Sequence, residues 1–518
     1  MDINSHENKL HGKPIDTPLF FDKVYGELIV LFGEAGVRCD SGSMERYSFS
    51  LSGKYVLPLA IVYPQKTDQL RQLLVLANKN GLQLYPISKG KNFGYGAAQG
   101  THEGQIIVDL CLMNRVLELN EELGFVSLEP GVSQQELYDY LQQKGSGLQI
   151  DVTGAGRHPS VVGNVLERGF GHTDYGNRFD SILGMEVLLP DGKLMRTGFG
   201  DYPGVLKTTY RHGMGPSVDG LFTQSNFGIV TKLSLALQPR PAYFSMFVYF
   251  ASKEEGLEPL VEVVRTLKSS GVLNSCVHIA NKERLERPGA TNKTGAWNVS
   301  ISLSGPKAIA KARKKTIQTA FRKQKLQGKG IEVTDNRLKL LGLINKYVCT
   351  LSAYPSLKEA VNLKKGRPTE SYVQELMGDL NVNSGNMHLG KGQNCFKWIS
   401  AVSTAEPKAV RKLVSLTKTA LEAKGYGFRV TLTFISARAL IMISEIQYPN
   451  TTEAIQKAEN DYNSIVKLLA ENGYYAYRSG SGNYTTVVPK VLPLKTMLKR
   501  VKDALDPNGI LAPGKYGV

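Results

Sequence analysis

The chain has 518 residues, of which 42% are hydrophobic and 21% are charged. This composition is typical of a folded globular protein, and it excludes collagen-like and intrinsically disordered classes. The formal net charge is +17, and nine Lys or Arg with no acidic residue fall within residues 307–329. No apolar run approaches the length that crosses a bilayer, so we expect a protein of two or three domains without a membrane span.

The first ten residues lack the apolar core of a signal peptide, which predicts a cytoplasmic protein. The five cysteines are far apart and include no Cys-x-x-Cys pair, so reduced thiols are expected. The eight histidines show no paired ligand spacing, and we therefore expect no metal site.

The first clear elements surround a glycine-rich loop. Residues 67–81 have the pattern of a helix with a capping Thr67, one apolar face and a terminal Gly81. Residues 82–86 and 105–110 read as buried strands. The loop between these strands, residues 86–98, therefore follows the end of a strand, where α/β folds bind ligands.

This loop carries residues suited to an anion. Ser88, Gly90 and Asn92 are small or hydrogen-bonding, and Gly94 and Gly96 flank an aromatic hydroxyl. Glycines let backbone N–H groups converge on an anion, because no Cβ keeps the ligand away. A phosphate or pyrophosphate is the obvious ligand. The spacing matches neither the Rossmann nor the Walker A pattern, so an ordinary turn is the alternative.

The next stretch alternates local signals with glycine-rich segments. Ser133 and Glu136 form a capping box that opens a helix to about residue 143. Residues 151–176 hold more glycine than packing requires, and residues 184–198 read as two strands joined by a hairpin at Asp191-Gly192. Residues 220–232 are a polar, glycine-bounded element that ends in a strand. Pro239 and Pro241 then interrupt the pattern, and we expect a domain boundary there.

Beyond residue 241 the chain reads as strand–helix–strand units that lie on one antiparallel sheet. The expected segments are 244–250, 258–268 and 272–279; 298–303, 307–329 and 331–334; and 396–402, 408–423 and 428–434, continued by 439–446 and a helix through 469. A last helix, 495–505, is stopped by Pro507.

The segment 307–329 is predicted to be an amphipathic helix with a very basic outer face. Such a face is either solvated or docks an acidic protein or substrate carrier. Nucleic acid is not expected, because the run has a single aromatic residue and no recognisable binding module accompanies it.

Five motifs in a fixed order carry a resemblance to a known family. They are Ser88-Lys-Gly-Lys-Asn-Phe-Gly-Tyr-Gly96, Gly163-Asn-Val-Leu-Glu-Arg-Gly-Phe-Gly171, Gly184-Met-Glu-Val187, Asp219-Gly-Leu-Phe-Thr-Gln-Ser-Asn226 and Asp506-Pro-Asn-Gly-Ile-Leu-Ala-Pro-Gly514. Together they resemble the vanillyl-alcohol oxidase / 4-cresol dehydrogenase flavoproteins, from about residue 50 to the last residue.

The resemblance implies an α+β fold in which a two-lobed, PCMH-type FAD-binding domain carries a ferredoxin-like, antiparallel-sheet cap domain. The FAD-binding domain is expected over residues 1–238 and the cap over 239–470, with residues 471–518 returning to the FAD-binding domain.

The resemblance also implies how FAD is held. The loop wraps the pyrophosphate, Lys515 falls where the family has a cation near flavin N1, and His388 is the candidate for a covalent bond to the flavin 8α carbon. Non-covalent FAD is the alternative to that bond. The residues expected at the cofactor are Ser88, Lys89, Gly90, Lys91, Asn92, Gly163, Asn164, Gly171, Ser225, Asn226, Ile229, His388 and Lys515.

Tyr95, Tyr477 and Arg478 match the two tyrosines and the arginine that hold a phenolate in the phenol oxidases of the family. A permanent cation and two phenolic donors stabilise a phenolate at neutral pH. The activity implied is hydride transfer from the benzylic carbon of a 4-substituted phenol to flavin N5 through a quinone methide, with O2 or a cytochrome as acceptor and a possible homodimer.

The sequence departs from the family pattern in several places, and the loop glycine run of the dehydrogenase branch is largely replaced. The carboxylate that the oxidase branch places near flavin N5 has no match in residues 152–158, and the paired histidines of the cap are replaced around Ile441 and Met442. Two other functions therefore stay open. One is oxidation of a hydroxy acid or sugar alcohol with Arg478 on a carboxylate, and the other is a degenerate flavoprotein that docks an acidic redox partner.

Overall fold

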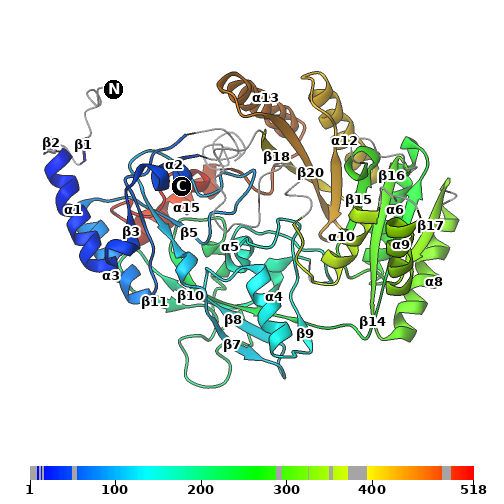
Figure 1. Ribbon diagram of the computed structural model, residues 1–518, viewed down its shortest axis with the longest axis horizontal. Coiled ribbons are helices and arrows are strands. Elements are labelled where there is room, and N and C mark those ends of the chain that lie inside the picture. Colours follow the sequence, from blue (N-terminus) through cyan, green and yellow to red (C-terminus); the bar gives the residue numbers. More distant parts are fainter. Residues whose placement is uncertain are drawn as a thin grey trace.

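The computed structural model describes residues 9–10, 13–14, 17–49, 55–174, 176–286, 294–324, 326–348, 354–370, 394–480 and 492–518. Two bodies of similar size lie side by side in Figure 1, and the last residues lie with the N-terminal one. None of the helices in these ranges is long and apolar enough to cross a membrane.

A four-stranded sheet occupies the N-terminal end, with the order β3-β4-β6-β5. The strands β4, β6 and β5 are parallel, and β3 is antiparallel to β4. α1 (Thr17–Phe32) packs against α3 (Thr67–Asn80), and both contribute to the core of this sheet. The strands are β3 (Val37–Arg38), β4 (Ala60–Val62), β5 (Leu84–Ile87) and β6 (Ile106–Asp109).

The predicted helix over residues 67–81 is confirmed, apart from its cap. The helix buries four apolar side chains on one face and ends at Gly81, whose φ of 65° is left-handed. Thr67 is the first helical residue and not the cap, because Lys66 occupies the N-cap position and its side chain makes no capping hydrogen bond. Glycine at the C-cap accepts the left-handed conformation at little steric cost.

A five-stranded antiparallel sheet with the order β11-β10-β12-β8-β7 follows. The predicted hairpin at Asp191-Gly192 joins β10 to β11, and Gly192 has a φ of 82°. The predicted capping box opens α4 (Gln134–Gln143). The strands are β7 (Val116–Asn120), β8 (Phe125–Leu128), β10 (Ile182–Leu188), β11 (Leu194–Arg196) and β12 (Ile229–Ala236).

The second body is built on a seven-stranded sheet in which every described pair is antiparallel, with the order β17-β14-β16-β15-β19-β20-β18. The predicted single antiparallel sheet, and with it the α+β fold class, is confirmed. The strands are β14 (Tyr243–Ala251), β15 (Val277–Asn281), β16 (Trp297–Gly305), β17 (Gly328–Val333), β18 (Asn394–Thr404), β19 (Val430–Phe434) and β20 (Ala439–Pro449).

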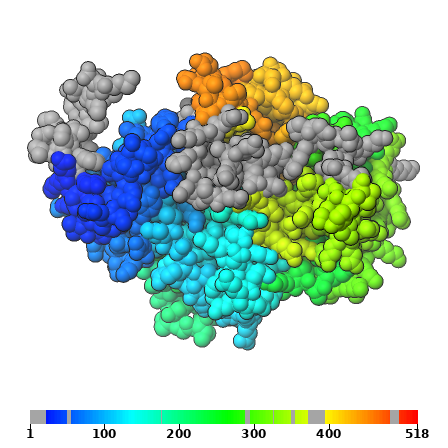
Figure 2. Space-filling model, viewed as in Figure 1, coloured from blue at the N-terminus to red at the C-terminus, as the bar shows by residue number. Residues whose placement is uncertain are grey.

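Side chains alternate between the two faces of this sheet, as strand geometry requires. On β14, Phe247 and Tyr249 join the helix-covered core, whereas Met246 and Val248 point to the opposite face. The helices on the covered face are α6 (Leu257–Ser269), α8 (Lys307–Lys323), α12 (Pro407–Glu422) and α13 (Thr452–Glu471). Figure 2 shows α12 and α13 as the gold and orange surface at the top of the molecule.

Two predicted boundaries were wrong. The basic helix ends at Lys323, and the rest of the basic run enters β17, because Gly328 and Gly330 let that strand approach β14 where a Cβ would meet Phe250 and Phe247. The strand predicted over 272–279 begins only at Val277.

The opposite face is partly covered by α9 (Asp335–Tyr347) and α10 (Tyr354–Lys364), which pack on β14 and β17. The remaining elements are β1 (Lys9–Leu10), β2 (Lys13–Pro14), α2 (Ser41–Ser48), β9 (Leu148–Gln149), α5 (Val161–Leu166), β13 (Gln238–Pro239) and α7 (Lys282–Leu285).

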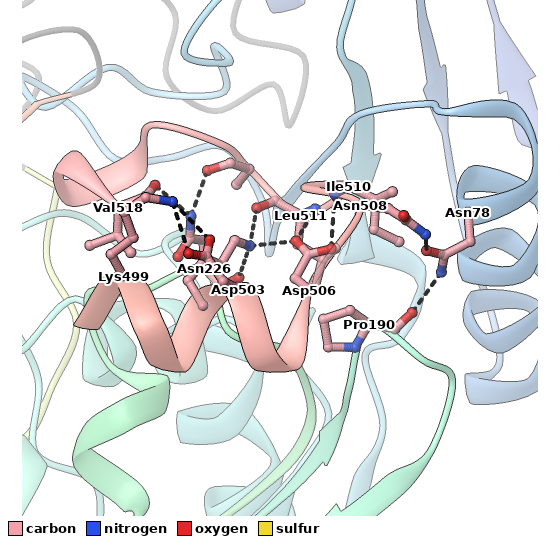
Figure 3. A network of polar contacts seen from close by, with 12 residues as sticks. Asn78, Pro190, Asn226, Lys499, Asp503, Asp506, Asn508, Ile510, Leu511 and Val518 are labelled. Atoms are coloured by element: carbon pink, nitrogen blue, oxygen red, sulfur yellow. Dashed lines mark hydrogen bonds and ion pairs between the residues drawn. The ribbon is translucent and has the colours of Figure 1, made fainter. Parts of the chain in front are cut away.

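After the second body, α15 (Leu492–Leu505) brings the chain back to the first. Buried Asp506 accepts hydrogen bonds from the backbone N–H groups of Ile510 and Leu511, both at 2.9 Å (Figure 3). Lys502 Nζ donates to Asp506 Oδ2 at 2.5 Å. Leu84 N donates to Ile510 O at 2.7 Å, so residues 510–512 cover the free edge of β5. The division at residues 238 and 470 remains a proposal.

Candidate active site

A cavity of about 670 Å³ lies between the first body and the open face of the seven-stranded sheet. The first body contributes the loop after β5, residues from 153–172 and 222–230, and residues 511, 512 and 515. The sheet contributes side chains from β14 to β20, among them Phe396, Trp398 and Thr433. The predicted loop thus follows the end of β5 and lines this cavity.

The loop holds its shape through positive φ angles and close packing. Gly90, Gly94 and Gly96 have φ angles of 61°, 73° and 106°. A Cβ on Gly94 would lie 2.6 Å from Trp398 Nε1, and Trp398 Nε1 donates to the Phe93 carbonyl at 3.0 Å. Only glycine fits these positions without strain, which fixes the loop backbone against β18.

Two lysines of the loop differ in environment. Lys89 forms an ion pair with Glu136 at 3.4 Å. Burial, followed by the charge of Arg46, lowers the pKa of Lys91 to about 8. No carboxylate among the described residues forms an ion pair with Lys91. A bound phosphate would supply the missing counter-charge.

Most of the other predicted cofactor residues meet at the same cavity. A Cβ on Gly163 would lie 2.9 Å from Ser88 Oγ, so α5 and the loop touch. Asn226 Nδ2 donates to the Ala512 carbonyl at 3.1 Å, while its buried Oδ1 has no partner among the described residues. The cavity wall includes Ser88, Lys89, Gly90, Lys91, Asn92, Gly163, Asn164, Ser225, Asn226, Ile229 and Lys515.

Among the described residues, one predicted cofactor residue, Gly171, is not on that wall. Gly171 faces Asp151, whose carboxylate occupies the place that a Cβ would take. His388 lies outside the described residues, so its predicted bond to the flavin stays a prediction.

Tyr95, Tyr477 and Arg478 come together at one end of the cavity. The Arg478 guanidinium lies 4.6 Å from the Tyr95 ring centroid, and Arg478 Nη2 donates to Asn92 Oδ1. Tyr477 N donates to the Ser400 carbonyl of β18 at 3.0 Å, which sets Tyr477 beside the sheet edge. Side chains from two distant segments therefore converge beside β18.

The charges at this end are well defined. Burial alone would lower the pKa of Arg478, but the nearby Tyr477, Glu167 and Tyr95 raise it above its ordinary value. Burial, followed by Tyr477, raises the pKa of Tyr95 well above its usual range, against a smaller lowering by Arg478. Arg478 is therefore a fixed cation and Tyr95 a neutral hydroxyl at physiological pH.

Glu167 joins this group although the sequence analysis did not single it out. It accepts from Tyr516 Oη at 2.6 Å, pairs with Lys515 Nζ at 3.3 Å and lies 3.8 Å from Arg478 Nε. Burial opposes its ionisation, but Lys515 and Arg478 lower the pKa of Glu167 overall. Its signal in the sequence is that it is the single acid in the motif over residues 163–171.

A second polar group lines the cavity further along the sheet and was also missed. His278 of β15 and Lys364 of α10 face the cavity, and the His172 ring stacks on His278 with centroids 4.4 Å apart. The two histidines come from different segments, so spacing along the sequence gives no signal for their pairing.

The geometry of the first body fits a dinucleotide with a flat ring. Glycine backbone that permits close approach and the partly buried Lys91 ammonium, which forms no ion pair with a described residue, suit a pyrophosphate. Asn226 Oδ1, which no described residue contacts with a hydrogen bond, is an acceptor suited to a ring or ribose donor. The large cavity and the aromatic residues of β18 leave room for a heteroaromatic ring beside them.

Comparison with known proteins supports this assignment. A family model described as FAD binding domain matches residues 58–198. A 1'-carboxy-chondrochloren decarboxylase of Chondromyces crocatus is 30% identical over 88% of this chain and 90% of its own length. The 4-cresol dehydrogenase [hydroxylating] flavoprotein subunit of Pseudomonas putida is 28% identical over 96% of each chain.

Among solved structures, a 4-ethylphenol oxidase from Gulosibacter chungangensis in complex with isoeugenol matches with a TM-score of 0.85 and 26% identity, covering 96% of this chain and 97% of the other. The cofactor is FAD, and the chain is an FAD-dependent oxidoreductase. With these full-length matches and the five motifs in order, the chain belongs to the vanillyl-alcohol oxidase / 4-cresol dehydrogenase family of PCMH-type FAD-binding flavoproteins.

Proposed function

We propose that this protein oxidises 4-substituted phenols at the benzylic carbon, with FAD as hydride acceptor. The observation that carries the proposal is the meeting of Tyr95, Tyr477 and Arg478 at one end of the cavity. The names of two relatives, a 4-cresol dehydrogenase and a 4-ethylphenol oxidase, point to the same substrate class. A lone buried tyrosine is usually a core residue, but an arginine and two tyrosines in one cavity fill complementary roles.

The three side chains act on the phenol oxygen. Arg478 supplies a fixed positive charge, and the hydroxyls of Tyr95 and Tyr477 donate hydrogen bonds, so the substrate binds as its phenolate. The phenolate pushes electron density through the ring toward the 4-position, which weakens the benzylic C–H bond. Loss of hydride then leaves a neutral quinone methide, to which water adds to give a benzylic alcohol. Bound FAD supplies the acceptor for that hydride.

Glu167 positions this machinery. It lies between Arg478 and Lys515 and is held by the Tyr516 hydroxyl. One carboxylate thus orients the substrate-side cation and the proposed cofactor-side cation Lys515, which would stabilise negative charge near flavin N1.

The remaining expected roles stay proposals. Ser88, Lys89, Gly90, Lys91 and Asn92 hold the pyrophosphate. Gly163, Asn164, Ser225, Asn226 and Ile229 line the cofactor, and His388 tethers it, whereas Gly171 is not proposed there because it faces Asp151. We also propose O2 or a cytochrome as electron acceptor, a cytoplasmic location and a homodimer.

The test is to reduce the FAD-loaded protein anaerobically with a 4-alkylphenol. The reduction is monitored as bleaching of the visible spectrum of the flavin. Arg478→Ala is expected to retain FAD and to lose bleaching rate by on the order of a hundredfold to a thousandfold, as for loss of one charge-stabilising donor. Arg438→Ala, an exposed arginine between β19 and β20, is the matched control. Equal bleaching by both variants would contradict the proposal. Colour that stays in an acid-precipitated pellet would support the His388 tether.

One alternative keeps Arg478 at the centre. Its buried Nε makes no hydrogen bond among the described residues, with the Glu167 carboxylate 3.8 Å away, and a guanidinium suits a substrate carboxylate. Oxidation of a hydroxy acid or sugar alcohol is therefore the second candidate. Bleaching by lactate-type acids but not by phenols would favour it.

The basic helix α8 gives less support to a docked redox partner. Its Phe321 packs on Phe247 and Tyr249 of β14. Met246 and Val248 of β14 point to the other side of the sheet and face the cavity. The seven-stranded sheet therefore separates a partner on α8 from the cavity.

A further inference from the structure

The polar group around His278 has the makings of an anion site. Lys364 Nζ donates to the Cys276 carbonyl at 3.2 Å and contacts His278 Nδ1 at 3.4 Å. Lys364 is 3% exposed and His278 is 8% exposed, yet both line the cavity. The His172 ring stacks on His278 with an interplanar angle of 9°. We call these three residues the His278 cluster.

The hydrogen-bond inventory of the cluster is incomplete. An ammonium group has only donors, so His278 Nδ1 accepts from Lys364 and the ring proton sits on Nε2. That Nε2 is buried and has no partner among the described residues. Lys364 has three N–H donors, and two are used. Two donors therefore lack acceptors within the described ranges, and leaving buried donors unpaired is costly.

The charge around the cluster is also unbalanced. Burial, followed by the charge of Lys364, lowers the pKa of His172 to about 3, so that ring is neutral. Two carboxylates lie in the surroundings: Asp174, whose charge raises the pKa of Lys364 against the effect of burial, accepts from Ser304 Oγ at 2.6 Å, and Glu359, which also lines the cavity, accepts from Thr369 Oγ1 at 3.2 Å. Within the described part of the chain, neither forms an ion pair with Lys364. Donors and positive charge face the cavity together.

The cluster lies on the same cavity as the proposed phenol clamp, but further along the sheet. β19 and β20 separate β15 from β18, and Tyr477 follows the β18 edge. At about 4.8 Å per strand, β15 is roughly 14 Å from β18. Ile443, Thr431 and Thr433 line the cavity between them and offer methyl groups to an alkyl chain.

We propose that the His278 cluster binds a carboxylate on the side chain of the substrate, so that the enzyme takes phenols whose 4-substituent ends in a carboxylate. The donors of His278 Nε2 and Lys364 Nζ meet the two carboxylate oxygens, and the stacked His172 holds the His278 ring in place. This inference rests on the proposed phenol oxidation for the other end of the substrate.

Two binding series test the subsite on the FAD-loaded protein. The first uses ω-phenylalkanoates of increasing chain length, which lack the phenol hydroxyl, and measures binding by calorimetry. Lys364→Met is expected to weaken their binding roughly tenfold to a hundredfold, as for loss of a charged hydrogen-bond partner. Lys358→Met, an exposed lysine of the same helix, is the matched control and should bind as the wild type does.

The second series compares ω-(4-hydroxyphenyl)alkanoates with 4-alkylphenols of the same length in anaerobic reduction of the flavin. Lys364→Met should raise the half-saturating concentration of the carboxylated phenols alone. His278→Phe roughly keeps the ring volume and removes the Nε2 donor, so it should also raise the half-saturating concentration of the carboxylated phenols. It therefore tests the subsite even if the Lys364 variant fails to fold.

The outcomes separate the two proposals. Carboxylates that bind through Lys364 while no phenol bleaches the flavin would support the subsite and sink the phenol proposal. A different result would overturn the subsite and leave the phenol proposal standing. In that result phenols bleach the flavin, and Lys364→Met changes the half-saturating concentrations of carboxylated and neutral phenols equally, as Lys358→Met does.

Discussion

Gly94 offers a direct test of how the loop and the seven-stranded sheet fit together. In Gly94→Ala, the added Cβ would lie 2.6 Å from Trp398 Nε1 and 2.7 Å from Phe396 Cε2. The residue would also keep a φ of 73°, which L side chains rarely adopt. Both costs fall on the seam between the two bodies, where the cavity lies.

The expected magnitude is the sum of two effects. A side chain at positive φ costs roughly 1–2 kcal/mol. Forcing a methyl group into packed aromatic rings costs roughly 1–3 kcal/mol. Gly94→Ala should therefore lower the free energy of unfolding by roughly 2–5 kcal/mol, and it should weaken FAD retention because the loop must move away from Trp398.

Gly104→Ala isolates the contact. Gly104 has a φ of 80°, but a Cβ there meets no heavy atom within 4 Å. Only the φ cost applies, so the control should lose roughly 1–2 kcal/mol. Urea unfolding of the FAD-loaded proteins, followed by circular dichroism, measures both. Equal losses in the two variants would refute the proposed packing of the loop on β18.

Two further predictions follow from buried lysines. Lys502 Nζ donates to Asp506, the Asn226 carbonyl and the Leu511 carbonyl, so Lys502→Met should cost about 3–5 kcal/mol in urea unfolding by leaving Asp506 buried and unpaired. The control is Lys499→Met on the same helix, which removes an exposed ion pair with Asp503 and should lower the free energy of unfolding by about 0.5 kcal/mol or less. Similar losses in the Lys502 and Lys499 variants would contradict the role of the buried pair. Burial lowers the pKa of Lys364 to about 8; the charge of Lys268 adds to that shift, and Cys276 and Asp174 oppose it. The Lys364 side chain is therefore a cation below that pH and neutral above it. Calorimetry on both sides of that pH should show carboxylated ligands losing affinity as the pH rises past about 8, and the bound anion should move the midpoint of this loss to higher pH. An affinity that does not change with pH would exclude Lys364 as the cation that binds the carboxylate.

The elements that the sequence predicted best are those fixed by neighbours in the chain. The capping box of Ser133 and Glu136, the Asp191-Gly192 turn and the C-terminal Gly81 of α3 each depend on a few consecutive residues. Their outcome needs no knowledge of the rest of the fold, because the hydrogen bonds that decide them are local.

The parts that the sequence did not predict depend on distant segments. Glu167 has its role because Arg478, Lys515 and Tyr516 arrive from the far end of the chain. His172 and His278 stack only because the loop after α5 meets β15. No periodicity or spacing encodes such contacts, since they follow from how the two bodies dock.

The boundary errors have the same origin. The run of basic residues continued the helical pattern beyond Lys323, yet Gly328 and Gly330 take the chain into β17 because β14 offers an edge to pair with. Tertiary pairing overrode local propensity there.

The covered edge of β5 has a consequence for the order of folding during synthesis. Asn508 Nδ2 donates to Asn78 Oδ1 across 430 residues of chain, and Ile510 and Leu511 belong to the core of the four-stranded sheet (Figure 3). At about 5–20 residues per second, a ribosome needs roughly 20–90 s to make the chain between them. The seven-stranded sheet, by contrast, uses only residues between Tyr243 and Pro449. The part of the protein that is made first is therefore completed last, and its open strand edge must be kept from other chains in the meantime.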